Sequence, residues 1–550
     1  MSRRREVLLV TTLAVVTTIV MTYPLTFQLG TGGRVDSEDG QFSVWNIAWV
    51  AHAMGAAPTQ LFHANIFYPH RNTLAFSEAN LVAGTLAVPP YWLTRNPYIA
   101  HNSVVLLSFM LALVGTYALV KYLTGRPAAA AVSGVLFAFC PFVFARSAHI
   151  QLLMTAGLPF SMLAFHRLAD SPTVGRGIAL GLILAVTGLA CGYYGLFAGL
   201  MVGVSILFYA VVFGRWRKLD YWSAIGVAVL TGAVITGACF IPYMEVASTH
   251  GAIARTLDDA RMYSADWRAY LASPARSHRW LLERIEFWNE VLFPGFVSLG
   301  LSVIGLTFWR PTHDATRTSA PRRGPRLQPG ATLYALIGLL AWWASLGPSG
   351  GLYTLLFNIV PGFGMLRAPA RLGITVALCL AVLAGYGVTR LAAGRRAVGV
   401  AALVMLVALV ELAAIPYPHY QGPRYPAAYD MLARLPPGSV AEFPYFSDRM
   451  EFPRHTYYMM GSTIHWQPLI NGYSDLIPQD FRAEAKSLAQ FPTEEAFVIL
   501  ERHETRYVVL HRQFYEAAHW ASLDARLAGF SDRLRLILQD QNARLYEIVY

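Results

Sequence analysis

The sequence is poor in charged residues and in cysteine. Only 14% of its 550 residues are charged, against about a quarter in soluble domains, whereas 55% are hydrophobic. Cys140, Cys191, Cys239 and Cys379 all lie in apolar runs and include no C-x-x-C pair, which argues against a zinc site of the usual spacing and against a structural disulfide. The composition predicts an integral membrane protein whose cysteines are packing residues.

The sequence also lacks the usual signatures of nucleotide and metal chemistry. It contains no G-x-x-x-x-G-K-[ST], no H-E-x-x-H and no G-x-G-x-x-G after a strand. Residues 347–351, GPSGG, fit G-x-S-x-G formally, but they follow a predicted helix and carry Pro348 before Ser349, so a serine nucleophile is not expected. The net charge of +11 resides mostly in short loops between apolar runs, which indicates membrane orientation rather than nucleic-acid binding.

Eleven apolar runs are predicted to span the membrane. A span needs about 20 residues to cross about 30 Å of hydrocarbon, so residues 81–93, which end near Pro89 and Pro90, are predicted to be re-entrant or interfacial. The alternative, a broken span at 81–93, would invert every later assignment. The predicted spans are 8–29, 99–120, 127–145, 150–165, 178–190, 196–213, 223–243, 291–309, 332–345, 372–389 and 398–415.

The positive-inside rule orients these spans. Arginines at positions 3–5 place the N-terminus in the cytoplasm, and with that register nearly every strongly basic short loop falls on the cytoplasmic side. The most basic of these is 310–326. Everything from residue 416 onward is then extracytoplasmic.

The last 135 residues have a soluble composition. The segment AAYDMLARLPPGSVAEFP predicts a helix, a turn and a strand, RYVVLH and ARLYEIVY predict further strands, and 492–503 predicts a helix. The expected fold is therefore a polytopic α-helical membrane domain with about 11 transmembrane helices (residues 1–415, first outer loop 30–98) and a soluble α/β domain (416–550).

Three acids begin the first outer loop. A carboxylate at the membrane boundary near an aromatic surface such as Trp45 can act as a general base, and Asp39 leads this group, with Asp36 and Glu38 beside it. The alternative is a solvated acidic turn that caps the helix after it. Glu78 closes the same loop and is the weaker candidate.

The loop after these acids is predicted to contain an amphipathic helix at 42–52. Trp45 and Trp49 lie one helical turn apart in it, a spacing that suits a helix in the headgroup layer.

Two arginines are predicted at the outer mouth of a span, against the positive-inside rule. Arg367 and Arg371, in PGFGMLRAPAR, offer planar forks of donors that suit phosphate oxygens. The alternative is that both reach to outer-leaflet headgroups. Glu411 is expected to pair with one of them. His63, His70, Arg71 and His101 are lesser candidates.

The order of these motifs resembles that of the GT-C superfamily of integral-membrane glycosyltransferases, in particular its bacterial members with an exported C-terminal domain. The resemblance rests on Asp39 six positions before Trp45, on NIFYPHRNTLAFSE, on YSAD at 263–266, on MLRAPAR and on STIHWQPLINGYS. It covers the whole chain in layout. Three acids crowd the first-loop position, so the choice between Asp36 and Asp39 stays open.

The resemblance implies a hexosyl- or pentosyltransferase. The donor would be a polyprenyl-phosphate sugar, and the acceptor a glycan, lipid or protein hydroxyl at the outer face of the bacterial cytoplasmic membrane. Asp39 would deprotonate the acceptor, with Asp36 and Glu78 as further catalytic candidates. Arg367 and Arg371, with His70 and Arg71, would hold the donor phosphate, and the product would have inverted stereochemistry.

A divalent cation, Mg²⁺ or Mn²⁺, is also compatible with the resemblance. Asp36, Glu38 and Asp39 would be its ligands. No other cofactor is expected.

Two rival functions share parts of this pattern. A flippase or transporter of lipid-linked sugars shares the many spans, but the spans carry few of the ionisable groups that usually line a transport path. A non-catalytic envelope assembly protein would explain the exported domain, but not acids and arginines predicted on one face. The transferase reading requires that the acids near position 39 and the arginines near position 369 meet around one cavity.

The tail contains a further set of ring side chains. His465, Trp466 and Tyr473, with His455 and Asn471, are candidates for an acceptor-binding groove, or equally for packing and turn residues.

Overall fold

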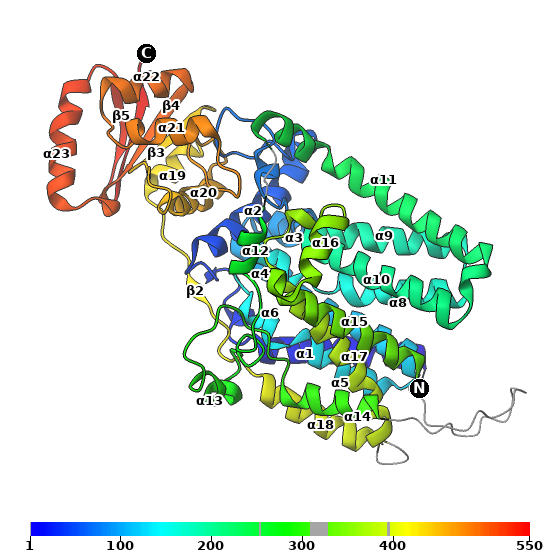
Figure 1. The fold of residues 1–550 in the computed structure, drawn as a ribbon. Helices are drawn as coiled ribbons and strands as arrows, with labels where there is room; N and C mark the ends of the chain where they lie inside the picture. Colours follow the sequence, from blue (N-terminus) through cyan, green and yellow to red (C-terminus); the bar gives the residue numbers. More distant parts are fainter. Residues whose placement is uncertain (1, 252–254, 308–327, 393–396) are drawn as a thin grey trace, which may run out of the picture. The chain divides into compact units, whose positions relative to one another are not determined.

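The computed structural model describes residues 2–251, 255–307, 328–392 and 397–550 and is mostly helical (Figure 1). It divides into two compact units. Unit 1 comprises Met1–Phe27, Val105–Cys239 and Ala254–Tyr417, and unit 2 comprises Gln28–Val104, Phe240–Ile253 and Pro418–Tyr550. The predicted basic loop 310–326 lies outside the described residues. Each unit is therefore built from three separate stretches of chain.

Unit 1 contains most of the helices, and each of the eleven predicted spans has a helical counterpart. The helices outside the first loop and the tail are α1 (Arg3–Met21), α4 (Pro97–Thr124), α5 (Pro127–Ala138), α6 (Pro141–Ala145), α7 (Ile150–Leu153), α8 (Gly157–Asp170), α9 (Val174–Ala190), α10 (Gly192–Val212), α11 (Leu219–His250), α12 (Leu257–Met262), α13 (Arg279–Leu282), α14 (Phe296–Leu306), α15 (Pro329–Ser345), α16 (Leu352–Ile359), α17 (Gly373–Leu391) and α18 (Ala397–Leu412).

Five helices among the described residues are long and apolar enough to cross a membrane: α4, the Pro127–Ala145 pair, α10, α11 and Pro369–Leu391. Leu230 on α11 is 65% exposed and Val234 is 62% exposed, as expected for side chains in contact with hydrocarbon rather than water. The chain is therefore a membrane protein, as its composition predicts.

Helix α17 forms the centre of one helix group, because it packs against α5, α14 and α15. A Cβ atom on Gly305 would lie 2.1 Å from the Leu383 carbonyl oxygen, and one on Gly387 would lie 2.1 Å from that of Leu301. These two glycines allow α14 and α17 to approach backbone to backbone. A second group is formed by α8, α9 and α10, which lie side by side (Figure 1).

The predicted span at 150–165 is not one helix. Helix α7 ends at Leu153, and α8 begins at Gly157. Pro159 has no N–H to donate to the Thr155 carbonyl, so it is tolerated only in the first turn of a new helix. The run is apolar enough for a span, but its proline divides it.

Unit 2 contains the sheet of the predicted soluble domain. Its strands are β3 (Ser439–Phe443), β4 (Thr505–His511), β5 (Leu534–Gln539) and β6 (Ala543–Ile548), in the order β3-β4-β6-β5. β3 and β4 are parallel, whereas the other two pairs are antiparallel. Its helices are α19 (Ala427–Leu432), α20 (Thr456–Gly461), α21 (Gln479–Leu488), α22 (Glu494–Arg502) and α23 (Ala517–Leu527). The predicted α/β fold of the tail is confirmed.

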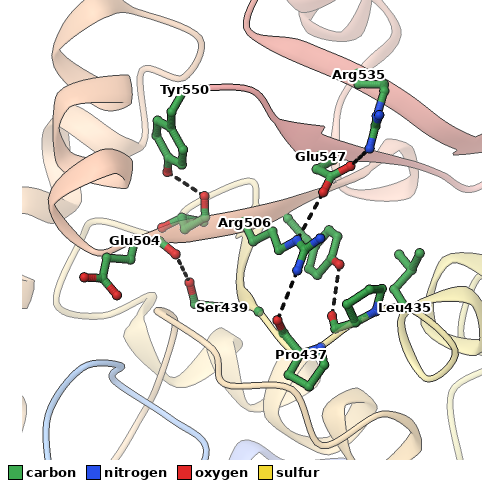
Figure 2. A network of polar contacts seen from close by, with 12 residues as sticks. Leu435, Pro437, Ser439, Glu504, Arg506, Arg535, Glu547 and Tyr550 are labelled. Carbon is green, nitrogen blue, oxygen red and sulfur yellow. Dashed lines mark hydrogen bonds and ion pairs between the residues drawn. The ribbon is translucent and has the colours of Figure 1, made fainter.

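One end of this sheet is fixed by a polar network (Figure 2). Arg506 Nε donates to Glu547 Oε1 at 3.1 Å, and Arg535 also pairs with Glu547. The Ser439 hydroxyl donates to the Glu504 carbonyl at 2.7 Å, and the Tyr550 hydroxyl to that of Thr505. The network links β3, β4, β5 and β6.

The first loop belongs to the same unit as the tail. It contributes β1 (Gly32–Gly33), which pairs with β2 (Tyr420–Gln421), and helices α2 (Glu38–Ala56) and α3 (Leu81–Thr94). Residues 467–471 lie between the loop and the sheet: the Leu469 N–H donates to the Asn65 carbonyl at 2.9 Å, and the Ile470 N–H to that of Val440 at 2.9 Å. Two of the motifs that carried the resemblance, NIFYP and HWQPLIN, thus bond to each other.

The predicted boundary between the membrane domain and the soluble domain is 415/416. It lies close to the point where the chain passes from unit 1 to unit 2, between Tyr417 and Pro418. The assignment of residues 1–415 as the catalytic domain stays a prediction.

The predicted headgroup position of Trp45 and Trp49 is wrong. Trp45 is 1% exposed and Trp49 is 9% exposed, within a core that also contains Phe67 and Phe443. Trp45 Nε1 donates to Asn65 Oδ1 at 3.2 Å. The i,i+4 tryptophan pair faces the interior of unit 2, because tail residues distant in sequence, such as Trp466 beside Trp49, supply the apolar surface that covers it.

Candidate functional site

The three acids of the first loop surround the start of α2. Ser37 is the N-cap of α2, and its hydroxyl accepts from the Gly40 N–H at 3.3 Å, so Glu38 and Asp39 lie in the first turn. A Cβ on Gly40 would lie 1.5 Å from the Arg34 carbonyl oxygen, which explains why the chain needs glycine where it folds back on itself. The capping geometry of the alternative interpretation is therefore present, since acids are favoured in a first turn.

The three acids are all exposed. Arg34 Nε donates to Asp36 Oδ1 at 2.9 Å, so Asp36 is ion-paired. Nowhere in the described part of the chain do three or more His, Cys, Asp or Glu side chains gather as metal ligands, so Asp36, Glu38 and Asp39 do not form such a group.

Glu78 lies just before α3 and is tied to α2 through its backbone. Its carbonyl accepts from Asn46 Nδ2 at 3.3 Å and from Asn80 Nδ2 at 3.2 Å. Asn46 is fully buried on α2, about two turns after Asp39. The structure thereby joins the two ends of the loop that carry the predicted catalytic acids.

His70 and Arg71, the predicted helpers in phosphate binding, differ from each other. His70 Nε2 lies 3.0 Å from an Asp480 carboxylate oxygen, and the His250 ring lies 5.3 Å from the His70 ring. Burial is the main cause that lowers the pKa of His70. His70 is thus engaged with a carboxylate, whereas Arg71 is exposed.

The predicted acceptor residues of the tail do not share one environment. His465 Nδ1 accepts from the Gln467 N–H at 2.9 Å, and burial lowers the pKa of His465 to about 3. Tyr473 packs edge-on against Phe42. Trp466 lines a cavity of about 600 Å³ within unit 2.

Unit 1 holds the basic half of the predicted site. The MLRAPAR segment runs through a short 3-10 turn, Pro369–Leu372, into α17. The Tyr353 hydroxyl donates to the Leu366 carbonyl at 2.7 Å, and the Ala370 N–H donates to the Tyr263 carbonyl at 3.1 Å. The YSAD and MLRAPAR motifs, about 100 residues apart in sequence, are therefore hydrogen-bonded neighbours.

Both arginines of this segment lie over aromatic rings. The Arg367 guanidinium lies 5.3 Å from the Tyr263 ring centroid, and that of Arg371 lies 4.3 Å from the Tyr193 ring centroid. The Arg367 N–H also donates to the Tyr193 hydroxyl at 3.0 Å. Among the described residues, no carboxylate lies within ion-pair distance of either guanidinium, so their charge is available to an added anion.

Sequence reasoning missed one neighbour of this group. Arg146, which follows α6, forms an ion pair with Glu290, a carboxylate only 4% exposed. Burial and, second, the nearby charge of Arg371 lower the pKa of Arg146 to about 10, so Arg146 stays charged at neutral pH. No local pattern links positions 146 and 290, because the two residues are brought together only by long-range packing.

The predicted pairing of Glu411 with Arg367 or Arg371 is wrong. Glu411 Oε1 lies 3.0 Å from His278 Nε2, and Glu411 also accepts from the Phe296 and Val297 N–H groups at the start of α14. A carboxylate at a helix N-terminus satisfies donors that have no partner inside the helix. Glu411 therefore caps a helix.

The sequence predicts that Ser349 is not a nucleophile. In the structure Ser349 lies in a 3-10 turn, Gly347–Gly350, whereas the serine of a G-x-S-x-G nucleophile lies between a strand and a helix.

No protein-family model and no curated protein matches this sequence. Among solved structures, it resembles the mycobacterial arabinofuranosyltransferase AftD at 14% identity and a TM-score of 0.61, over all of this chain and 42% of AftD. It resembles ArnT from Cupriavidus metallidurans, bound to undecaprenyl phosphate, at 15% identity and a TM-score of 0.51, over 100% of this chain and 99% of ArnT. The oligosaccharyltransferase of Archaeoglobus fulgidus matches at 13% identity and a TM-score of 0.45, over 92% of this chain and 69% of that one. Over its whole length, this polypeptide has the fold of the GT-C membrane glycosyltransferases, AftD and ArnT among them.

Proposed function

We propose that this protein is a glycosyltransferase that moves a sugar from a polyprenyl-phosphate carrier to an acceptor hydroxyl on the extracytoplasmic side of the bacterial cytoplasmic membrane. The fold supports this proposal, because ArnT shares it over nearly the full length of both chains and its structure contains undecaprenyl phosphate. The sugar is a hexose or a pentose, and the acceptor is a glycan, lipid or protein hydroxyl.

One observation carries the proposal: Arg367 and Arg371 are held on tyrosine rings without a carboxylate partner in the described chain. A guanidinium beside aromatic surface stays charged and offers two parallel donors to a phosphate oxygen pair. When the anomeric carbon–oxygen bond breaks, negative charge grows on the departing phosphate. Donors fixed in advance at that point stabilise the transition state more than the ground state.

Asp39 is the proposed general base. Its carboxylate accepts the proton of the acceptor hydroxyl while the hydroxyl oxygen attacks the anomeric carbon, and the carrier leaves as polyprenyl phosphate. This direct displacement inverts the configuration of the sugar. Asp39 is preferred because it is the acid that lies six positions before Trp45 in the motif order that carries the resemblance, and Asp36 is the alternative. Glu78, also tied to α2, is the next candidate.

Two secondary roles belong to the same proposal. Arg71, being exposed, and His70 are further candidates for donor-phosphate binding. A bound Mg²⁺ or Mn²⁺ would need ligands beyond Asp36, Glu38 and Asp39, since these three do not gather.

The test is transfer by the purified protein in liposomes that contain a polyprenyl-phosphate pentose or hexose. A glycosyltransferase releases polyprenyl phosphate in proportion to glycosylated acceptor, and mass spectrometry detects both products. A flippase instead moves the intact lipid between leaflets without cleaving it, and an envelope assembly protein does neither. Either of these two results would contradict the proposal.

A further inference from the structure

A cavity of about 600 Å³ lies within unit 2, where α2, the end of α3, the start of α4 and the tail come together. Its volume is that of a typical small-ligand site. Five ring side chains line it, together with one arginine: His52, Tyr91, Tyr98, Tyr425, Trp466 and Arg95. None of the residues that line it is an aspartate or a glutamate.

The Trp466 ring is held firmly on one wall. It stacks on the His52 ring at 4.5 Å with 17° between the planes, and it meets the Trp49 ring edge-on at 5.6 Å. Trp466 Nε1 donates to the Tyr91 hydroxyl at 3.1 Å. A ring fixed from several directions presents a rigid flat surface at little entropic cost to a ligand.

The charge of the cavity comes from Arg95. Arg95 is exposed, its guanidinium lies 5.8 Å from the Tyr91 ring centroid, and no carboxylate among the described residues pairs with it. Burial, and second the charge of Arg95, lowers the pKa of His52, so His52 is neutral at neutral pH. The cavity therefore carries a single positive charge.

Arg95 and Trp466 share an unusual backbone conformation. Their φ angles are +54° and +55°, in the left-handed region that non-glycine residues rarely adopt. Such residues cluster at binding sites, where the surrounding structure offsets the strain of holding a side chain in place. Here they supply the charge and the largest ring of one cavity.

We propose that this cavity binds a saccharide that carries a negative charge. The apolar face of a pyranose ring would lie on the aromatic wall, the Tyr91 and Tyr98 hydroxyls would meet sugar hydroxyls, and the carboxylate or other anion of the sugar would pair with Arg95. The assignment of this saccharide as the acceptor rests on the proposed function, whereas the binding itself does not.

The test is isothermal titration calorimetry of the full-length protein in detergent. The probes are trigalacturonate, trimannuronate and a hyaluronan tetrasaccharide, with maltotriose as the neutral comparison. At least one uronate should bind ten times more tightly than maltotriose. Arg95→Gln should remove that difference, since a charge-assisted hydrogen bond is lost, and Trp466→Ala should weaken both classes of probe. Arg434→Gln, an exposed arginine of the tail, is the matched control.

Three results would overturn the proposal: no saccharide binds, Arg95→Gln binds the uronates as tightly as the parent protein, or short-chain phosphatidylglycerol displaces the saccharide and binds more tightly. Circular dichroism and the melting temperature of each variant show whether it is folded, and Arg95→Gln replaces an exposed side chain. Uronate binding without any sugar transfer would reject the proposed function and leave the cavity assignment intact. Transfer without saccharide binding would reject the cavity assignment and leave the proposed function intact.

Discussion

In the two regions that carry the predicted site, the charged side chains have different kinds of partner. In unit 2, Asp36 pairs with Arg34, Asp480 with His70, and Glu38 and Asp39 lie in the favourable first turn of α2. In unit 1, Arg367 and Arg371 lie on tyrosine rings without a carboxylate among the described residues.

The difference shows which residues need a functional explanation. An acid in a helix first turn, or one beside an arginine, is accounted for by stability alone. Stability alone does not account for two arginines that lie on aromatic rings at the end of a membrane helix and have no carboxylate partner among the described residues. The arginines of unit 1 are therefore the stronger evidence for an anionic ligand. The catalytic role of the acids in unit 2 depends more on experiment, because stability alone can explain their positions.

The largest expected effect tests the acidic group. Asp39→Asn should lower transfer by about 10²–10⁴-fold with little change in folding, because it removes a general base and keeps the side-chain shape. Steady-state transfer and the melting temperature measure the two quantities. Glu38→Gln, in the same helical turn, is the matched control and should keep most of the activity. Normal transfer by Asp39→Asn would remove Asp39 from the mechanism.

The next effect tests the basic group. Arg367→Gln and Arg371→Gln should each reduce turnover by about 10²-fold, as for the loss of one stabilising donor in other enzymes. Lysine at either position should restore part of the rate, since it keeps the charge but not the planar fork. Arg261→Gln, whose exposed side chain pairs with Asp258, is the control. If both glutamine variants kept full turnover, Arg367 and Arg371 would have no role in transfer, and the difference between the two units would not reflect function.

A third prediction concerns stability rather than turnover. Glu442 and His511 are fully buried and lie 2.6 Å apart, and the Tyr429 hydroxyl also donates to Glu442. Glu442→Gln should destabilise the protein by about 3–5 kcal/mol, because it breaks a buried pair by changing one partner. The denaturation midpoint of the full-length protein measures this, with the exposed Glu516→Gln as control. An unchanged midpoint would mean that the pair contributes no net stability.

A pH effect of smaller size follows from His455. Burial lowers the pKa of His455 to about 4, from an unfolded value near 6.5. The neutral ring is favoured in the folded state, so stability is complete above pH 6.5 and is lost as the pH falls toward 4, by about 2 kcal/mol or less at pH 5. Melting temperatures at pH 7 and pH 5 should therefore differ less in His455→Asn than in the parent. An equal difference in both proteins would contradict the assignment to His455, and the exposed His519→Asn should behave as the parent does.

The smallest expected effect tests whether Asp36 or Asp39 is the general base. Asp36→Asn should cost about 1 kcal/mol or less in stability, as for a partly exposed ion pair, and should keep transfer near the parent rate. Transfer and melting temperature are again the measurements. A loss as large as that expected for Asp39→Asn would move the role of base to Asp36.

Much of the fold follows from local pattern. Apolar runs, Pro-Pro-Gly at 436–438 and alternating strands locate the eleven helical regions and three of the four strands of the main sheet. The errors come from long-range packing. Trp45 and Trp49 have the spacing of an interfacial helix, but distant residues cover them, and Glu411 is paired by a histidine 133 positions away rather than by an arginine.

The candidate site was predictable only in part, for the same reason. Arg367 and Arg371 were identifiable because they break a charge rule, whereas the Tyr193 and Tyr263 rings beneath them carry no sequence signal of that role. The gathering of the acids and the arginines around one cavity stays a prediction.

The hydrogen bonds between residues 65–68 and 467–471 also set an order of events during synthesis. Gln467 follows Asn65 by 402 positions, so at about 5–20 residues per second the ribosome delivers it on the order of 20–80 s later. Throughout that time Trp45, Phe67 and Phe76 lack the tail side chains that complete their core. A chain that stops at residue 415 would keep this apolar surface uncovered, and we expect it to be retained by chaperones or degraded rather than to survive as a smaller enzyme.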